Sequence, residues 1–414
     1  MNKIRNRYLE RRINILAIFL HNSLWGSRIR GDERRFLELA KRFATLGAKL
    51  SVIEFAPSLQ KFYYKANVYT SIELERKGLI GVIIQLIRLT NKFKNFDIIY
   101  VYNQDFLNLL AGIIFKLFTR KPLVMVVQSL QDIELPLKTL RQMYGTSLID
   151  LIFILSHKYF LMPLALRLAN IVFTVSNTLK RNLIERYPSV RGKIVATFNG
   201  VDTNKFHPMN LEKEYDVIFL GRIHITHKGI DKILLIWKNI VNRYPQAKLI
   251  IVGGFESERD REILYKLIEK LDIRNNVIVT GFIDDDKVAF YLNKAKAFIS
   301  LSTYEGFGLS ILEALACGLP VITTDLEVFR ELHGNLLFYV STKNAKDLVI
   351  AAKKLLMLLH DGLINESLNT TLQEHIKKFS WDLVAYRELA FIKKRLNFKP
   401  NKEIGEQWKL EKST

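Results

Sequence analysis

Two acidic residues, Glu305 and Glu313, enclose a glycine-rich turn whose residue types suit the binding of phosphate and sugar groups. The apolar run 296–302 before the turn predicts a buried parallel strand, and 308–317 after it predicts a helix. The first N–H groups of a helix and its dipole favour phosphate oxygens. A strand, a tight turn and a helix N-terminus in succession therefore predict a phosphate site.

Each residue of this turn has an expected contact. Gly306 and Gly308 would let a diphosphate approach the backbone closely, because glycine carries no side chain. Glu305 follows the carboxyl edge of the strand, where a polar sugar could be held. Glu313 is expected about two turns along the helix, within reach of a ribose. Phosphate, ribose and sugar contacts together predict a nucleotide-sugar pocket.

A second loop carries two cations, Arg222 and Lys228, after an apolar strand at 215–221. Cations beside a diphosphate would neutralise the charge that builds on the leaving group as a glycosidic bond breaks. Taken alone this loop is weak evidence, since a basic residue after a strand is usually only solvated. Two further glycines that follow strands, Gly253 and Gly281, could pack against the nucleotide or simply turn the chain.

Alternating apolar strands and helical segments predict parallel sheets covered by helices. Strands are expected near 13–20, 49–55, 97–102, 122–128, 170–176, 193–197, 215–221, 247–252, 276–280, 296–300, 320–324 and 336–340. Helices are expected near 31–46, 78–93, 105–118, 147–168, 177–187, 229–243, 257–271, 285–294, 308–317 and 344–360, with a helical pattern over 364–398.

The polar stretch 204–214 is the expected crossing between two domains. We predict an N-terminal Rossmann-like domain over 1–206 and a nucleotide-sugar-binding domain over 207–378. The segment 379–414 is predicted to form a helix that crosses back to the first domain, followed by a frayed tail. Ligands of such open sheets bind beyond the carboxyl ends of the strands, so the two sheets are expected to face a cleft.

The chain of 414 residues has a formal net charge of +21 and a single cysteine, Cys317. The charge fits anionic partners such as lipid headgroups or phosphorylated substrates, or simply a lysine-rich surface. The lone cysteine fits a reducing compartment. The basic N-terminus and the short apolar run 13–20 read as a first strand rather than a signal peptide, and no transmembrane helix is predicted.

Two segments, 147–168 and 79–89, are unusually apolar. A core helix is the default interpretation of each. The alternative is an amphipathic helix that rests on a bilayer, with lysines and arginines at the level of the headgroups.

Three ordered motifs carry a family resemblance: Phe198–Thr203, Phe219–Asp231, and Glu305–Glu313 with the residues up to Ile322. With them, nearly the whole chain resembles retaining glycosyltransferases of the GT-B fold, particularly the large family with a Glu-x7-Glu motif (glycosyltransferase family 4-like, glycosyl transferases group 1). The resemblance implies an α/β fold of two Rossmann-like domains. It also implies a hexosyltransferase-type enzyme that transfers a sugar with retention of anomeric configuration.

The resemblance also implies roles for individual residues. Arg222 and Lys228 would bind the donor diphosphate, and Glu305 would contact the donor sugar. Glu313 would hold the ribose hydroxyls. The remaining implied contacts are the backbone amides around Gly306, Phe307, Gly308 and Leu309, the loop that ends at Gly31, which could instead only make a turn, and a cleft-lining position at Ser176, which could instead only cap a helix.

The chain departs from the family at Gln128, where many relatives place a histidine. Gln128 could contact the donor sugar or the acceptor, but it cannot act as a general base. A departing phosphate oxygen is then the expected proton acceptor. No metal or other cofactor is expected, because metal-ligand patterns are missing from the sequence and the run Asp284–Asp286 is expected to cap a helix.

The predicted function is transfer of a sugar from a UDP- or GDP-linked donor to a hydroxyl of a glycan or lipid-linked acceptor. Cell-surface polysaccharide or glycolipid biosynthesis fits this, in the cytoplasm or peripherally on the inner face of the plasma membrane. The alternatives are a GT-B nucleotide-sugar epimerase and a non-catalytic membrane-surface binding protein. Nucleic acid is not an expected partner, because the aromatic and basic interleaving of a recognition module is not evident.

Overall fold

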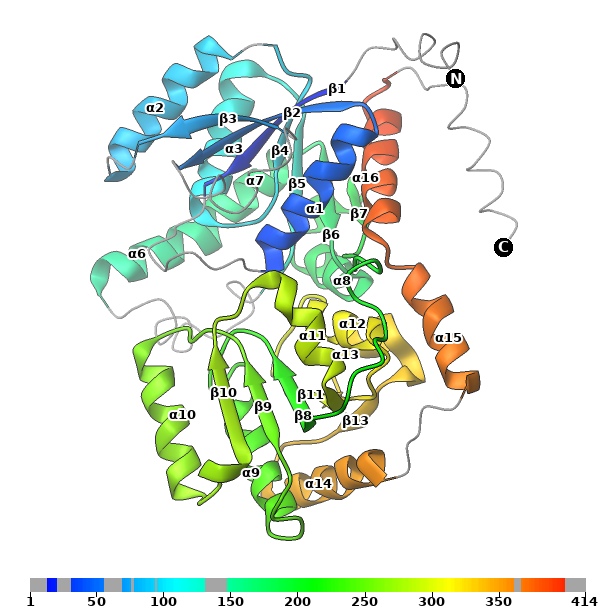
Figure 1. Ribbon diagram of the computed structural model, residues 1–414. Coiled ribbons are helices and arrows are strands. Elements are labelled where there is room, and N and C mark those ends of the chain that lie inside the picture. The colour runs from blue at the N-terminus through cyan, green and yellow to red at the C-terminus, as the bar shows by residue number, and fades with distance from the viewer. Residues whose placement is uncertain are drawn as a thin grey trace. The chain divides into compact units, whose positions relative to one another are not determined.

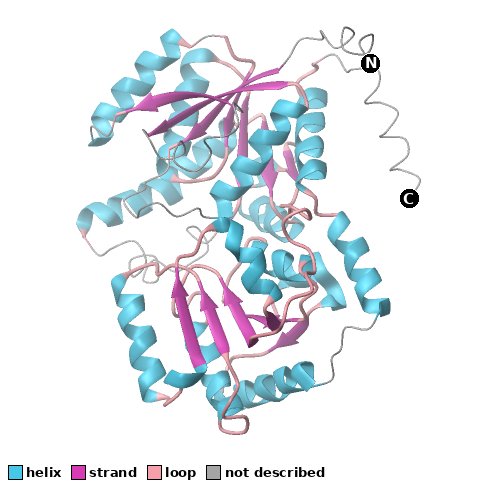
Figure 2. Cartoon of the chain, viewed as in Figure 1, coloured by secondary structure: helices cyan, strands magenta, loops and turns pink. Residues whose placement is uncertain are grey.

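The computed structural model describes residues 13–20, 31–55, 69–75, 78–93, 95–130, 147–360 and 366–398. The chain divides into two compact units. The first combines Met1–Phe198 with Trp381–Thr414, and the second is Asn199–Ser380. Both are parallel sheets flanked by helices (Figure 1 and Figure 2), so the predicted α/β class with two Rossmann-like domains is confirmed.

The first unit contains a seven-stranded parallel sheet in the order β3-β2-β1-β4-β5-β6-β7. Its strands are β1 (Ile13–Phe19), β2 (Ala48–Phe55), β3 (Tyr69–Leu74), β4 (Ile98–Val101), β5 (Leu123–Val127), β6 (Ile171–Thr174) and β7 (Ile194–Ala196). The described helices that connect them are α1 (Gly31–Thr45), α2 (Gly78–Lys92), α3 (Phe106–Thr119), α6 (Leu148–Ser156), α7 (Met162–Leu168) and α8 (Asn177–Arg186).

Strand order decides which face of this sheet each helix covers. The step from β1 to β2 runs toward one edge, whereas the steps from β3 to β4, β4 to β5 and β5 to β6 run toward the other. Right-handed crossovers then place α1 on one face and α2, α3 and α7 on the opposite face. The contacts agree, because α3 touches both α2 and α7, and α1 packs against the C-terminal helix α16 (Trp381–Arg395).

The second unit contains a six-stranded parallel sheet in the order β10-β9-β8-β11-β12-β13. Its strands are β8 (Tyr215–Leu220), β9 (Leu249–Val252), β10 (Val277–Gly281), β11 (Ala295–Ser300), β12 (Val321–Thr324) and β13 (Phe338–Val340). Its helices are α9 (Ile230–Val241), α10 (Glu258–Lys270), α11 (Val288–Asn293), α12 (Leu309–Ala316), α13 (Glu327–His333), α14 (Ala345–His360) and α15 (Glu366–Lys377).

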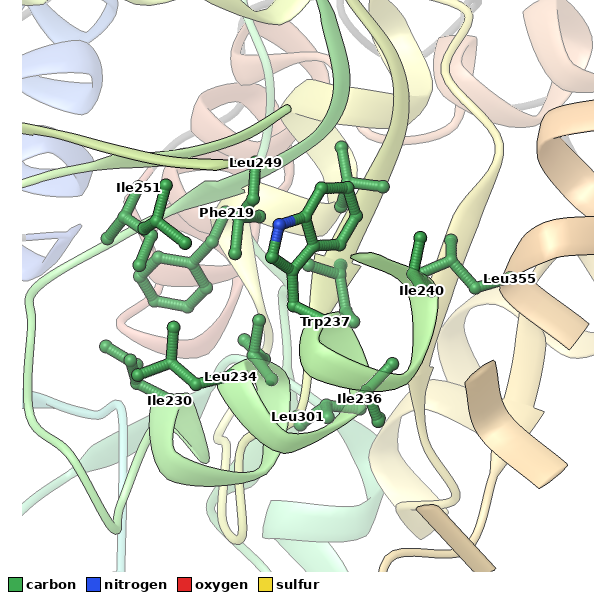
Figure 3. Packing of buried hydrophobic residues seen from close by; sticks show 14 of the residues in the cluster. Phe219, Ile230, Leu234, Ile236, Trp237, Ile240, Leu249, Ile251, Leu301 and Leu355 are labelled. Atoms are coloured by element: carbon green, nitrogen blue, oxygen red, sulfur yellow. The ribbon is translucent and has the colours of Figure 1, made fainter. Parts of the chain in front are cut away.

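Helix α9 supplies the centre of this unit's core. Ile230, Ile233, Leu234, Trp237 and Ile240 are buried on one helical stripe, the spacing expected of a helix that packs on a sheet. The indole of Trp237 lies among strand residues (Figure 3), and its N–H donates to the carbonyl of Asn276 at 3.1 Å.

The expected strands all appear, with small differences at their ends. Sequence analysis missed β3 and α13, which have 6 and 7 residues. Elements this short give too few positions for a period to stand out. The helical pattern over 364–398 is two helices, α15 and α16, and these belong to different units.

The first unit ends earlier than the sequence analysis placed it, at Phe198 rather than at residue 206. Val201 and Phe206 are buried, and the backbone N–H of Val201 donates to the carbonyl of Phe379 at 2.7 Å within the second unit. The sequence analysis placed the boundary too late because the stretch around it is mostly polar, and two buried apolar residues do not change that composition.

Helix α16 is held in the first unit by a buried polar network. Arg35 on α1 forms an ion pair with Glu388 on α16, and both side chains are almost fully buried, at 1% and 0% exposure. The hydroxyls of Thr197 and Tyr100 also donate to the Glu388 carboxylate, each at 2.7 Å. Two desolvated charges are tolerated because each provides the other's counter-charge.

The segment 147–168 is not the core helix of the default interpretation. It forms α6, a π-helical turn at His157–Leu161 and then α7. The stretch Asp150–Leu168 is long and apolar enough in composition to cross a membrane, yet only 28% of that window is buried. Its inner side packs on α3, and its outer side exposes large apolar residues.

We expect Glu388→Ala to lower the free energy of unfolding of the first unit by about 3–5 kcal/mol, because Arg35 would keep a buried charge without its partner. Chemical denaturation monitored by circular dichroism measures this. The control is Glu185→Ala on the exposed face of α8, with an expected change within about 0.5 kcal/mol. Equal effects of the two substitutions on the free energy of unfolding would contradict a stabilising role for the ion pair between Arg35 and Glu388.

Candidate functional site

The predicted site residues of the second unit gather on the loops that follow neighbouring strands β8 and β11. These loops are in direct contact. The backbone N–H of Thr303 donates to the carbonyl of His227 at 2.9 Å. At Gly229, with φ +65°, a Cβ atom would lie 2.2 Å from the carbonyl oxygen of Leu301. Only glycine permits this approach, so the two loops are fixed against each other.

A mostly buried ion pair joins the same two loops. Lys228 Nζ lies 2.5 Å from Glu305 Oε1, with side-chain exposures of 17% and 19%. The Ser302 hydroxyl also donates to this oxygen at 2.9 Å. Burial by itself would raise the pKa of Glu305, but the adjacent Lys228 ammonium and the Ser302 hydroxyl bring it below its ordinary value. Glu305 is therefore ionised at neutral pH.

Arg222 is held from a third loop, the one that follows β9. Its Nη1 lies 2.9 Å from Oε1 and 2.7 Å from Oε2 of Glu256, and both side chains are about 40% exposed. The backbone of Ile223 pairs with this loop, donating to the carbonyl of Gly254 at 2.8 Å. Exposed ion pairs stabilise by only about 0–1 kcal/mol, so an incoming anion can exchange with Glu256 at little cost.

Gly253 lies in this third loop and contacts the backbone of both neighbouring loops, including Gly281. At Gly253, φ is +147° and a Cβ atom would lie 1.9 Å from the carbonyl oxygen of Gly221. The N–H of Gly253 donates to the carbonyl of Gly281 at 3.1 Å. The close approach at Gly253 brings the backbone before Arg222 against the β9 loop. The structure thus favours a packing role for Gly253.

The turn that is predicted to bind phosphate lies between strand β11 and helix α12, the order of elements that the sequence predicted. Gly308 is the N-cap of α12 with φ +90°, and a Cβ atom there would lie 2.7 Å from the ring of Phe329. Phe307 is buried, and its ring centroid lies 5.9 Å from that of Phe379. Gly306 lies in the loop, and Leu309 is the first residue of the helix. The N–H of Ile311 donates to the carbonyl of Gly308 at 3.1 Å, so an anion at this helix start would use the amides that precede Ile311.

Glu313 lies closer to the helix start than expected. Because α12 begins at Leu309, Glu313 is little more than one turn along it rather than two, and its side chain is 4% exposed. Its charge also acts on the buried Cys317 thiol, whose pKa rises to about 12 through burial first and Glu313 second. Cys317 is thus an inert core thiol at neutral pH.

Two of the predicted site residues of the first unit form hydrogen bonds with the backbone of that unit. Ser176 is the N-cap of α8 and accepts from the N–H of Leu179 at 3.1 Å. The side-chain amide of Gln128 donates to the carbonyl of Tyr102 at 3.1 Å. Gly31 is the first residue of α1. Capping thus accounts for Ser176, one of the alternatives open in the sequence.

Two residues of the site escaped the sequence analysis as partners: Glu256 and Ser302. Glu256 follows a strand and two glycines, a position that could have signalled a counter-charge for Arg222. The pKa of His227 falls to about 4 because of burial and the neighbouring Lys228, so its imidazole is neutral. Ser302 could not be singled out, since serine after a strand is common.

The acidic run Asp284–Asp286 does not provide the expected cap. Asp284 precedes a short 3-10 turn without a side-chain capping bond, and Asp285 pairs with Lys205. Helix α11 begins only at Val288. Within the described residues, no group of three or more His, Cys, Asp or Glu side chains is arranged to hold a metal ion.

Each half of the chain matches a glycosyltransferase family model. Residues 29–205 match the model of Glycosyltransferase Family 4, and residues 201–373 match the model of Glycosyl transferases group 1. The fold is GT-B, and both halves match glycosyltransferase families.

Individual proteins agree with this. A sucrose-phosphate synthase from Thermosynechococcus elongatus superposes with a TM-score of 0.74 at 19% identity, covering 92% of this chain and 99% of that one. The Anabaena protein HepE, solved with UDP and glucose, gives a TM-score of 0.72 at 18% identity, covering 92% and 100%. These likenesses establish the fold.

Among curated sequences, a phosphatidyl-myo-inositol mannosyltransferase of Mycobacterium tuberculosis is 29% identical over 202 residues, covering 45% of this chain and 50% of that protein. The chain spans about half the length of the curated relatives it matches.

Gly253→Ala is expected to destabilise the second unit by more than about 2 kcal/mol, because the added Cβ atom would collide with the Gly221 carbonyl at a positive φ. Thermal and chemical unfolding measure the loss. Gly192→Ala is the control, because nothing lies within 4 Å of a Cβ atom there. A Gly253 variant as stable as the control would show that the loops can separate freely.

The pH dependence of stability tests the buried ion pair. The folded pKa of Glu305 lies below its ordinary value of 4.5, so the carboxylate contributes stability that is complete above about pH 5 and lost as pH falls through the folded pKa. We expect the difference in unfolding free energy between the native protein and Glu305→Gln to be constant above about pH 5 and to shrink in acid.

Denaturant titrations over a pH series measure this difference. The matched control is Glu258→Gln, whose carboxylate is 71% exposed and should give no comparable acid-dependent difference. A Glu305 difference that stays constant into strong acid would show that the pKa of this carboxyl group is the same in the folded and unfolded states, which would contradict stabilisation by Lys228.

Proposed function

We propose that this protein is a retaining glycosyltransferase that moves a sugar from a nucleotide-diphosphate donor to a hydroxyl of a glycan or lipid-linked acceptor. The observation that carries the proposal is the convergence of Arg222, Lys228 and Glu305 on adjoining loops of one sheet edge. The glycosyltransferase family matches support the same activity.

The two cations suit the leaving group of such a reaction. Arg222 has a guanidinium that can exchange its exposed carboxylate partner for phosphate oxygens, which it can bind in a bidentate way. Lys228 has three N–H donors and uses one on Glu305, so others remain for the diphosphate. Charge that develops on the departing diphosphate would be stabilised by both, and by the N-terminus of α12.

Glu305 suits the sugar. It is ionised and held by Lys228 and Ser302, so its second carboxylate oxygen can accept from a sugar hydroxyl without a proton transfer. Glu313, about one turn into α12, is assigned to the ribose hydroxyls. Because both carboxylates serve the donor, the pair is not a hydrolase dyad.

The chemical step follows from these assignments. The bond between the anomeric carbon and the phosphate oxygen breaks, and the acceptor oxygen bonds to the same face of the anomeric carbon. The departing phosphate oxygen takes the acceptor proton. Anomeric configuration is retained, and neither a metal nor a side-chain general base is required. Gln128 fits this route, since a neutral amide can donate a hydrogen bond to a sugar but cannot take a proton.

The donor is proposed to be a UDP- or GDP-sugar. The structural neighbour HepE was solved with UDP and glucose, which favours the uridine member of this pair. Relatives that are named for a lipid acceptor, such as the phosphatidyl-myo-inositol mannosyltransferase of M. tuberculosis, favour an acceptor in glycolipid or cell-surface polysaccharide synthesis. The proposed location is the cytoplasm, with peripheral contact to the inner face of the plasma membrane.

Arg222→Ala should lower kcat by on the order of 10²–10³-fold, because one stabilising group for the leaving diphosphate is lost. Nucleotide release in the presence of donor and acceptor measures this. Arg261→Ala is the matched control, since Arg261 is also an exposed arginine in an ion pair of the second unit. Unchanged turnover of the Arg222 variant, with an intact fold, would contradict the role.

The donor class can be measured with the same proteins. A nucleotide sugar at 100 to 1,000 times its dissociation constant should stabilise the native protein by about 3–4 kcal/mol, and the Arg222 variant by less. UDP-, GDP- and ADP-sugars are compared by thermal shift. Release of nucleotide only when an acceptor is present separates a transferase from an epimerase, which would release a new nucleotide sugar instead.

A further inference from the structure

The outer surface of the first unit carries an apolar strip that the proposed transfer reaction does not use. Among the described residues of this unit, every exposed large apolar side chain lies on α2, α3 or the α6–α7 segment. They are Ile80, Ile84, Leu117, Phe118, Leu148, Ile152, Phe153, Tyr159, Phe160 and Leu164. The three segments are neighbours, since α3 contacts both α2 and α7 (Figure 1).

The longest part of this strip runs along α6 and α7. Leu148, Ile152, Phe160 and Leu164 stand four residues apart, which places them on one face of a helix. Four residues slightly overshoot an α-helical turn, and the wider π-helical turn at 157–161 offsets that drift. The sequence spacing and the π turn together produce a continuous apolar face.

Polar groups on this face are already satisfied. Ser156 occupies the gap between Ile152 and Phe160, and its hydroxyl donates to the carbonyls of Ile152 and Phe153 at 2.7 and 3.0 Å. Asp150 closes a capping box with Ser147. The face can therefore enter an apolar medium while the Ser156 hydroxyl keeps its hydrogen bonds.

The segment cannot be surrounded by lipid on all sides. Met162 and Leu166 are buried, and the ring of Phe153 packs on Phe106 at a centroid distance of 5.0 Å. His157 is buried and bonded to the carbonyl of Gln104 at 2.7 Å. Because one side is built into the domain, the stretch Asp150–Leu168 can rest on a bilayer but not span it.

Charge on the three segments indicates the kind of surface that covers the strip. They contain five lysines or arginines against one acid, Asp150. The five are Arg88, Lys92, Lys116, Lys158 and Arg167. Lys158 lies 5.9 Å from the centroid of the exposed Tyr159 ring, an aromatic–cation pair suited to the headgroup level. The chain as a whole carries +21.

We propose that α2, α3 and the α6–α7 segment form a docking surface for an anionic lipid bilayer, with the apolar strip inserted below the headgroups and the cations among them. An apolar face flanked by cations is the pattern of an interfacial helix. Binding combines burial of the apolar residues with attraction to anionic headgroups. This inference deepens the peripheral membrane contact of the proposed function. The surface is built from other residues than the nucleotide-sugar site, so failure of membrane docking can be distinguished from failure of sugar transfer.

Co-sedimentation with vesicles tests the surface without any sugar donor. The native protein should pellet with vesicles of phosphatidylglycerol and phosphatidylcholine, and much less with phosphatidylcholine alone. Ile152→Ser together with Phe160→Ser should weaken binding at least about tenfold, because two apolar side chains no longer leave water. Both residues are exposed, so unfolding curves should match the native protein.

Matched controls separate this strip from apolar and basic surface in general. Leu235→Ser with Met357→Ser removes two exposed apolar residues of the second unit and should leave vesicle binding unchanged. Lys158→Gln with Arg167→Gln should reduce the preference for phosphatidylglycerol, whereas Arg259→Gln with Lys266→Gln on α10 should reduce it less.

Two results would overturn the proposal. One is native vesicle binding that persists in the Ile152 and Phe160 variant. The other is a native protein that ignores vesicles and forms dimers that this variant abolishes, which would assign the strip to a second copy of the chain. Loss of transferase activity with intact vesicle binding would instead affect only the proposed function.

Discussion

The site depends first on the ion pair between Lys228 and Glu305. Two largely buried charges on loops from neighbouring strands must meet, since either charge alone would be strongly destabilising in that position. Their meeting fixes the register of the loop after β8 against the loop after β11. It also keeps the carboxylate ionised and leaves ammonium protons available to an anion.

The surrounding backbone makes this pairing geometrically possible. Gly229 and Gly253 sit where a Cβ atom would collide with a carbonyl oxygen, so three loops pack edge to edge at the end of the sheet. The second ion pair, between Arg222 and Glu256, differs in kind because it is exposed and weak. A fixed, largely buried ion pair and an exchangeable arginine are complementary properties that suit the proposed binding and release of a diphosphate.

The first unit combines a buried polar network with an exposed apolar surface. Its interior holds a buried network around Glu388 that fastens the returning helix α16 to the sheet domain. Its outer helices leave large apolar residues in contact with solvent. Exposed apolar area is unfavourable in water, so its concentration on three adjoining segments indicates a surface that is covered in use.

The sequence by itself determined most strands, the two-domain α/β class and the loops that carry Arg222, Lys228 and Glu305, because parallel strands buried on both faces read as apolar runs and glycine turns follow them directly. The sequence also predicted that the C-terminal helix returns to the first unit, as α16 does. Tertiary structure alone decided that Glu256 faces Arg222 and that α6 and α7 expose one side. Each of these depends on contacts between residues far apart in the chain. Local composition states that a side chain is apolar or charged, but only packing decides what lies against it.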